Sequence, residues 1–244
     1  MNDDTYMPQL SQMDFFTRSD LLSILNQNGI PISSSTANKL LQNLLNNGTI
    51  VRVGRNMYQA ADKIHIKYTH QYSELSEKTA YVISQNHPFL NFSIFELIQL
   101  NRFVNHQIAH NTVFVSAENG YENDVFETLK QNFSGTILIH PNAEIFHQYW
   151  TDNMIVIIRL LSEAPNGGKV KWHTCLEKML VDLLADSLLH EAVISSELPD
   201  IFANALDKYI VDENKLLRYA RRRSAEDKLR AFISQNTDFK FHLE

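Results

Sequence analysis

The chain has 244 residues, of which 44% are hydrophobic, and its formal net charge is −6. This length and apolar fraction predict two folded domains and argue against a disordered chain. The polar amino terminus does not resemble a signal peptide, and no apolar run approaches the roughly 20 residues of a membrane span, so we expect a cytoplasmic protein. The single cysteine, Cys175, excludes an internal disulfide and a cysteine-rich zinc site.

The first predicted elements are a strand and two helices. A short strand is expected over residues 14–17 and a helix over 19–27, which ends at the turn 28–31. A second helix is predicted over 34–46, because its apolar residues recur at the spacing of one helical stripe. The serine run 33–35 offers an N-cap, and Gly48 lies where a helix C-cap glycine is expected.

A tight basic hairpin follows the second helix. Ile50, Val51 and Val53 form a β-branched run, residues 54–56 supply a turn in which Gly54 tolerates positive φ, and residues 57–58 return. A helix followed by such a hairpin is the DNA-contacting end of a winged helix. We therefore predict a winged helix-turn-helix domain over residues 1–62.

The polar face of this helix and the hairpin carry side chains suited to a major groove. Hydroxyl, amide and cationic groups bind base edges and phosphates. The predicted DNA-binding residues are Ser34, Ser35, Asn38, Lys39, Gln42, Asn43, Arg52, Arg55 and Asn56. Residues 1–63 hold five basic and five acidic groups, so attraction to DNA would depend on local clustering. The alternative is a solvated face or a surface for protein contacts.

The remaining sequence predicts a linker over 63–75 and an α/β domain over 76–242. Helices are expected over 74–86, 122–132 and 143–150, and strands over 112–116, 136–140 and 154–160, whereas 92–100 is ambiguous. After the turn 165–168 the pattern becomes helical, over 174–190, 199–210, 215–220 and 225–233. The fold class is therefore α/β (α+β), with a small mixed sheet and a helical C-terminal part.

A basic segment stands out in this second domain. Residues 215–230 contain seven basic and two acidic residues. Arg218, Arg221, Arg222 and Arg223 form a possible second patch for phosphate or a partner protein. The alternative is a helix end at which cations favour the dipole. Glu177 and Asp182 could cap their helix or hold basic side chains of this segment.

The sequence offers little support for catalysis. His106 and His110 have the spacing of paired metal ligands but lack a third ligand. The strand over 154–160 has no acidic pair of the kind that nucleases use, and residues 167–169 lack the remainder of a phosphate-binding loop. We expect no enzymatic activity, no metal and no cofactor.

The order of motifs resembles a known family. The hairpin residues Val51, Arg52, Val53, Gly54, Arg55 and Tyr58, and the helix residues Glu177, Leu180, Asp182 and Leu183, carry the resemblance. The chain resembles the AbiEi-type antitoxins of type IV toxin-antitoxin systems. The resemblance implies that the winged helix represses its own operon by binding promoter repeats in double-stranded DNA. It also implies that the second domain counters a nucleotidyltransferase-like toxin, with direct contact left open. The alternative is an adaptor for protein interactions or a nuclease-fold component in phage defence.

Overall fold

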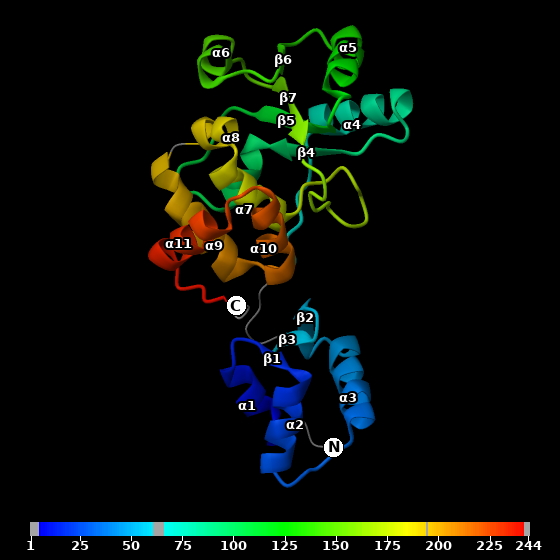
Figure 1. Ribbon diagram of the computed structural model, residues 1–244, viewed down its shortest axis with the longest axis vertical. Coiled ribbons are helices and arrows are strands. Elements are labelled where there is room, and N and C mark those ends of the chain that lie inside the picture. The colour runs from blue at the N-terminus through cyan, green and yellow to red at the C-terminus, as the bar shows by residue number, and fades with distance from the viewer. Residues whose placement is uncertain (1–4, 61–65, 194, 242–244) are drawn as a thin grey trace. The chain divides into compact units, whose positions relative to one another are not determined.

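The computed structural model describes residues 5–60, 66–193 and 195–241 (Figure 1). The chain forms two compact units, each built from separate stretches of sequence. Unit 1 contains Met1–Lys67 and Lys208–Asn214, and unit 2 contains Tyr68–Asp207 and Lys215–Glu244. Both contain helices and strands, which confirms the predicted mixed α/β class.

Unit 1 is a winged helix. Its elements are α1 (Met7–Gln12), β1 (Phe16–Thr17), α2 (Arg18–Gln27), α3 (Ser34–Asn46), β2 (Ile50–Gly54) and β3 (Met57–Ala60). The strands form an antiparallel sheet in the order β1-β3-β2. Helix α1 was not among the predicted elements. It is too short to show a period, but it lies against the core through the buried side chains of Tyr6 and Leu10.

Local signals set the ends of α2 and α3. Thr17 and Asp20 form a capping box at the start of α2, and the Ser33 hydroxyl accepts the Thr36 N–H at the start of α3. Gly48 follows α3 with φ of +69°, a conformation that favours glycine, and the next N–H returns to the carbonyl of Leu44 at 2.9 Å. The predicted helix over 34–46 and both of its caps are thus confirmed.

The hairpin turn differs from the expectation in one residue. Gly54 pairs with Met57 in the β2–β3 ladder, which leaves Arg55 and Asn56 as a two-residue turn. The left-handed residue is Asn56, with φ of +56°, and the assignment of positive φ to Gly54 was wrong. Asparagine tolerates this conformation because its short polar side chain can bond to nearby backbone.

Unit 2 is built on a mixed four-stranded sheet. Its strands are β4 (Phe92–Glu96), β5 (Thr112–Glu118), β6 (Ile137–Ile139) and β7 (Met154–Leu160), in the order β4-β5-β7-β6. Strand β4 is antiparallel to β5, whereas β5, β7 and β6 are parallel. The ambiguous stretch 92–100 is β4 followed by the 3-10 helix η2 (Leu97–Arg102).

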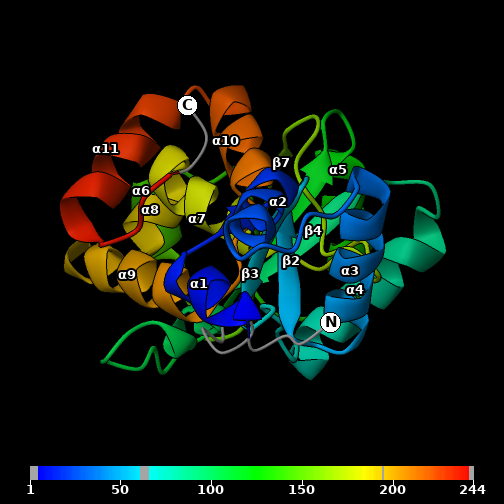
Figure 2. The ribbon, with the colours of Figure 1, turned by 90° about the horizontal axis from the view of Figure 1, so that it is seen from below.

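Helices cover both faces of this sheet, as Figures 1 and 2 show. On one face lie α4 (Glu74–Asn86) and α5 (Glu122–Asn132), and on the other α6 (Ala143–Gln148), α7 (Leu176–Ala185) and α8 (Ser187–Ala192). The alternation of side chains along β5 explains the two layers. Val113 and Val115 belong to the core beneath α4 and α5, whereas the ring of Phe114 stacks on that of Phe146 in α6.

The C-terminal part is helical, as expected. It contains η3 (Ser195–Glu197), α9 (Leu198–Lys208), α10 (Glu213–Arg222) and α11 (Glu226–Asn236). The single helix predicted over 174–190 was wrong, because the chain breaks at Asp186, where φ is −96° and ψ is 120°. The Asp186 carboxylate accepts the N–H groups of Leu188 and Leu189 and so caps α8.

Part of the predicted linker is integral to unit 2. Positions 63–65 lie outside the described residues, as does the boundary at 62. Residues 68–73 belong to unit 2, where the ring of Tyr72 is buried in the core, and α4 starts at Glu74. The tyrosines and histidine of this stretch explain the difference, since they bury surface that a polar linker would leave in water.

Candidate nucleic-acid interface

The predicted DNA-binding residues lie on the exposed side of α3 and on the β2–β3 hairpin. Ala37, Leu41 and Leu44 are buried on the opposite side of α3. Figure 2 shows α3 and the hairpin side by side. All of the predicted residues are exposed, namely Ser34, Ser35, Asn38, Lys39, Gln42, Asn43, Arg52, Arg55 and Asn56. We call this set, together with Arg18, the α3–wing surface.

The charge of the α3–wing surface is positive. Neither α3 nor the hairpin contains an aspartate or glutamate, whereas Lys39, Arg52 and Arg55 supply cations. The carboxylate of Asp20 in α2 is engaged in capping, since it accepts the N–H and the hydroxyl of Thr17. Helix α3 and the hairpin thus carry three cations and no acid, although residues 1–63 hold five basic and five acidic groups.

Arg18 joins the two parts of the surface and was not predicted. Its Nη1 donates to Oδ1 of Asn38 on α3, and its backbone N–H donates to Oδ1 of Asn56 in the hairpin turn, each at 3.4 Å. The sequence signal was weak, because these partners are 20 and 38 residues away. Only the capping box at Thr17, which fixes Arg18 as the first residue of α2, points to a defined position for it.

Other side chains of the surface also bond to each other. Nε2 of Gln42 donates to Oδ1 of Asn46 one helical turn away, at 3.2 Å. Nε of Arg52 donates to the carbonyl of Gly54 at 3.2 Å, which holds this guanidinium along the hairpin. These contacts limit the rotamers of exposed side chains before any ligand binds.

The basic patch of unit 2 contacts carboxylates of its own unit. Arg218 lies 2.7 Å from Glu163, Arg222 lies 3.8 Å from the same side chain, and Arg221 lies 2.8 Å from Glu226. The hydrogen bond from Arg218 lowers the pKa of Glu163. These ion pairs offset the positive charge that the sequence concentrates in this segment.

Arg223, the fourth residue of that patch, lies apart from the other three. Its side chain is 12% exposed and forms ion pairs with Asp182 at 3.4 Å and Asp186 at 3.2 Å. Asp182 also accepts Nζ of Lys178 at 2.7 Å and the hydroxyl of Tyr219 at 2.8 Å. Burial, followed by the nearby Asp182 charge, raises the pKa of Tyr219.

The sequence left two roles open for Glu177 and Asp182 in α7, namely capping of their helix or binding of basic side chains from residues 215–230. Asp182 binds Arg223, and Glu177 lies 3.6 Å from Nζ of Lys215 in α10. Both acids thus hold basic side chains of the C-terminal segment. Glu177 also lies in the first turn of α7, where its charge favours the helix dipole.

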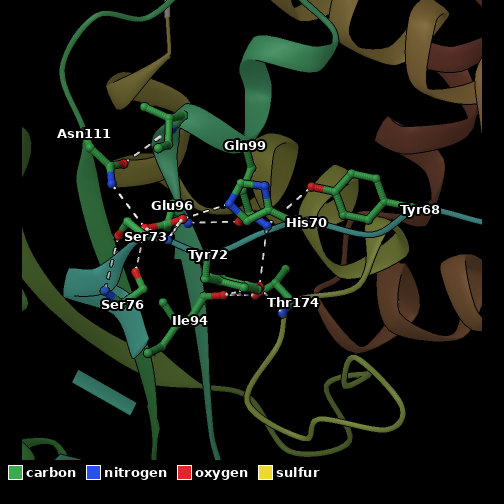
Figure 3. Close-up of polar contacts among 11 residues, drawn as sticks. Tyr68, His70, Tyr72, Ser73, Ser76, Ile94, Glu96, Gln99, Asn111 and Thr174 are labelled. Atoms are coloured by element: carbon green, nitrogen blue, oxygen red, sulfur yellow. Dashed lines mark hydrogen bonds and ion pairs between the residues drawn. The ribbon is translucent and has the colours of Figure 1, made fainter. Parts of the chain in front are cut away.

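A second polar cluster surrounds Glu96 at the end of β4 (Figure 3). The fully buried Glu96 carboxylate accepts Nε2 of His70 at 2.8 Å, Oγ of Ser76 at 2.7 Å and Nδ2 of Asn111 at 3.2 Å, together with the hydroxyl and N–H of Ser73. Burial alone would raise the pKa of this carboxyl, but hydrogen bonds from the histidine and the two serines outweigh it and lower the pKa to about 2. The cluster fastens residues 70–76 to the sheet.

Residues 36–238 match the model of a protein family described as "Family of unknown function (DUF6577)". The chain belongs to this family. No curated protein matches the sequence. The crystal structure of RV2827C protein from Mycobacterium tuberculosis is similar at 9% sequence identity, over 98% of this chain and 82% of that chain, with a TM-score of 0.24. That score is too low to support an argument from likeness.

In this member of the DUF6577 family the paired histidines do not converge. The stretch that carries His106 and His110 is not helical, and the two rings face different acids, Glu197 at 3.3 Å and Asp152 at 3.9 Å. Across the described residues no group of three or more potential metal ligands is found. Within the same residues no helix has both the length and the apolar character needed to cross a membrane.

Proposed function

We propose that unit 1 binds double-stranded DNA and that the chain represses its own operon. The observation that carries this proposal is the α3–wing surface, on which every predicted contact residue is exposed and no α3 or hairpin residue is acidic. In winged helices, a recognition helix enters the major groove and the hairpin approaches the backbone or minor groove. The side chains on α3 match that task, because amides and hydroxyls bind base edges.

The proposal gives the two parts of the surface different roles. Asn43 lies on the outward side of α3 and would contact a base edge, whereas Arg55 lies at the hairpin turn and would contact phosphate. Phosphate contacts add affinity for any sequence, and base contacts add discrimination. Ser34 and Ser35, at the N-terminus of α3, would add hydroxyl contacts to phosphate.

The first test is a fluorescence-anisotropy titration of the full chain. The duplex upstream of its own gene is compared with a scrambled duplex at two salt concentrations. Tighter binding to the native duplex that persists at higher salt supports the proposal. Equal binding to both duplexes that salt abolishes, or no binding, would refute it and leave the winged helix as a surface for protein contacts.

Two variants test the assignment of roles. Arg55→Ala should weaken binding to both duplexes about equally and reduce the dependence on salt, because it removes one phosphate contact. Asn43→Ala should reduce the preference for the native duplex, with a cost of about 1–3 kcal/mol at one base pair. Arg102→Ala is a matched control, since Arg102 is an exposed arginine in unit 2. Identical behaviour of the first two variants would count against these roles.

We further propose, from the resemblance to AbiEi-type antitoxins, that the chain counters a nucleotidyltransferase-like toxin without enzymatic activity of its own. The order of a winged helix, an α/β domain and a helical C-terminal part supports this proposal. We expect a nucleotidyltransferase gene beside this one. Expression of that gene should be toxic to the cell, and co-expression of the full chain should relieve the toxicity. If the toxicity of that gene is unchanged or increased when the full chain is co-expressed, the proposal is contradicted.

A further inference from the structure

The two edges of the unit 2 sheet differ in how they are covered. Strand β4 forms one edge, and its outer side is covered, because the Ile94 N–H donates to the carbonyl of Trp172 at 2.7 Å. Strand β6 forms the other edge and, among the residues that the structure describes, pairs only with β7. Figure 1 shows β6 between α5 and α6 at this end of unit 2. An uncovered edge strand can pair with a further strand.

The hydrogen bonds of β6 show which of its backbone groups face outward. Its bonds to β7 include the carbonyl of Thr136, at 3.0 Å, and the N–H of His140, at 2.9 Å. Backbone groups alternate between the two sides of a strand, so Leu138 also faces β7. Ile137 and Ile139 therefore direct their N–H and C=O groups away from the sheet.

These outward groups fit a second copy of the same strand. If two β6 strands run antiparallel about a two-fold axis at Leu138, Ile137 of each copy lies opposite Ile139 of the other. Both residues face outward, so each such pair can exchange both of its N–H···O bonds. Residues directly opposite each other point to the same face of a sheet, so the side chains of β6 keep the faces that they have in one copy.

Helix α5 is complementary to itself across the same axis. It lies over β6 and β7, so the strand spacing of about 4.8 Å would bring the two α5 helices to about 10 Å, the distance of packed helices. Glu122 at its start lies 3.6 Å from His140 at the end of β6, so α5 runs the length of the strand. The axis therefore places the acidic first turn of one α5 beside the last turn of the other, which carries Lys130. These opposite charges attract.

Helix α6 adds apolar side chains to this end of unit 2. One side of α6 faces α8, where His147 lies 3.5 Å from Glu191. Ile145 and Tyr149 lie on a different side, one helical turn apart, and are 40% and 53% exposed. Exposed apolar side chains beside an uncovered strand are typical of an interaction surface.

We propose that a second copy of the chain docks on β6, with α5 beside α5 and α6 beside α6, so that two copies form a symmetric dimer with one continuous sheet. In such a dimer the same surface serves both partners. The inference goes beyond the proposed DNA binding and does not depend on it. The dimer brings two winged helices to one duplex, as the reading of paired half-sites requires.

The first test is sedimentation equilibrium of the full chain. At about 100 µM, even an interface with a Kd of about 10 µM would be mostly dimeric. Ile137→Pro removes an outward N–H and spares the bonds to β7, so it should raise the Kd by about tenfold or more. The double variant Ile145→Ser/Tyr149→Ser should also raise the Kd. Phe89→Ser is the matched control and should leave it unchanged, since Phe89 is 95% exposed but precedes β4 at the opposite edge.

A disulfide cross-link tests the register. Leu138 faces its own copy across the axis as a non-hydrogen-bonded pair, in which the Cα atoms lie about 4.5 Å apart, a distance that a disulfide can span. In a Cys175→Ser background, Leu138→Cys should form a covalent dimer on mild oxidation. Phe89→Cys, in the same background, controls for random collision of exposed thiols and should remain monomeric on a denaturing gel.

Several results would overturn the inference. One is a chain that stays monomeric at about 100 µM, including a chain whose β6 pairs only with a strand of another protein. Another is a dimer that Leu138→Cys does not cross-link or that both the proline and the double serine variants leave intact, because another surface then joins the copies. If Ile137→Pro loses its cooperative thermal unfolding, the double serine variant decides, since it changes exposed side chains alone. Loss of DNA binding in the anisotropy titration would refute the proposed function and leave the dimer standing.

Discussion

The carboxylate of Glu96 is buried, and among the described residues it bonds to neutral donors and a histidine and to no lysine or arginine. Such an arrangement stabilises the fold only while the carboxyl is ionised, because the donors are directed at a charge. Since the folded pKa of about 2 lies below the ordinary value of 4.5, the stabilisation is present above pH 4.5 and is lost as the pH falls toward 2.

Glu96→Gln should therefore destabilise unit 2 in a pH-dependent way. The ionisation accounts for about 3 kcal/mol at pH 7, from the difference between the two pKa values. At pH 3 about 1 kcal/mol of it remains, so the gap between wild type and variant should shrink by about 2 kcal/mol. Urea denaturation at both pH values measures this gap. A gap that stays constant would show that the charge of Glu96 does not stabilise the fold.

Arg221 and Arg223 provide a matched pair for the basic segment. Arg223 is nearly buried between Asp182 and Asp186, whereas the side chain of Arg221 is 63% exposed beside Glu226. Arg223→Ala removes one of the two cations beside the buried Asp182 and the cation beside the half-buried Asp186, and should cost about 2 kcal/mol of unfolding free energy. Arg221→Ala should cost less than about 1 kcal/mol, because water screens an exposed pair. Urea denaturation measures the unfolding free energy of both variants. Equal losses of free energy would contradict the burial of Arg223 between Asp182 and Asp186.

For single residues, the sequence predicts whether a side chain is exposed better than it predicts which side chain it bonds to. The residues of the α3–wing surface were identified because a helical period separates Leu41 and Leu44 from Asn38 and Gln42. The contact between Arg18 and Asn38 was missed because no local pattern relates side chains on different helices. For the same reason, the sequence could not distinguish an exposed Arg221 from a buried Arg223 within one basic run.

At the scale of elements, prediction succeeded where an apolar pattern extends over the whole element. Helices α3 and α4 also have a serine N-cap, whereas α5 has no side-chain cap. Helices α3, α4 and α5 match their predicted ranges, and so does strand β7. Helix α1 and the break at Asp186 were missed for different reasons. The helix has six residues, too few for a period, and the break interrupts a run whose apolar spacing continues on both sides. An aspartate inside an apolar helix is a weak signal, because it can equally lie on a polar face.

The end of α3 gives a prediction at this scale. Gly48 has φ of +69° and no atom within 4 Å of the position that a Cβ would occupy, so an alanine there would suffer only from its backbone conformation. Gly48→Ala should cost about 1 kcal/mol. Gly135→Ala is the control, since its surroundings are equally open and its φ lies outside the left-handed region. Thermal unfolding of both variants measures the difference in stability. If Gly48→Ala is as stable as the wild type, a left-handed Gly48 does not stabilise the end of α3.

For the whole molecule, the sequence predicted two folded parts but could not reveal that both of them are discontinuous. Unit 1 takes Lys208–Asn214 from a region of helical pattern near the end of the chain. The link is made by backbone groups, since Ile66 N–H donates to the carbonyl of Lys208 and Ile210 N–H donates to that of Ile66, each at 3.1 Å. Backbone pairing over so long a separation leaves no mark on side-chain composition.

This interleaving sets an order of events during synthesis. The ribosome completes residues 1–67 early, but Tyr209, the bridge partner of Ile66, emerges only after residues 68–207 of unit 2 have been made. Domains usually fold as units from the amino terminus as they are translated, yet here unit 1 is not complete until residues 208–214 have been made. A chain released before residue 208 would therefore lack the second stretch of unit 1, so a complete unit 1 requires that residues 68–207 of unit 2 have already been made.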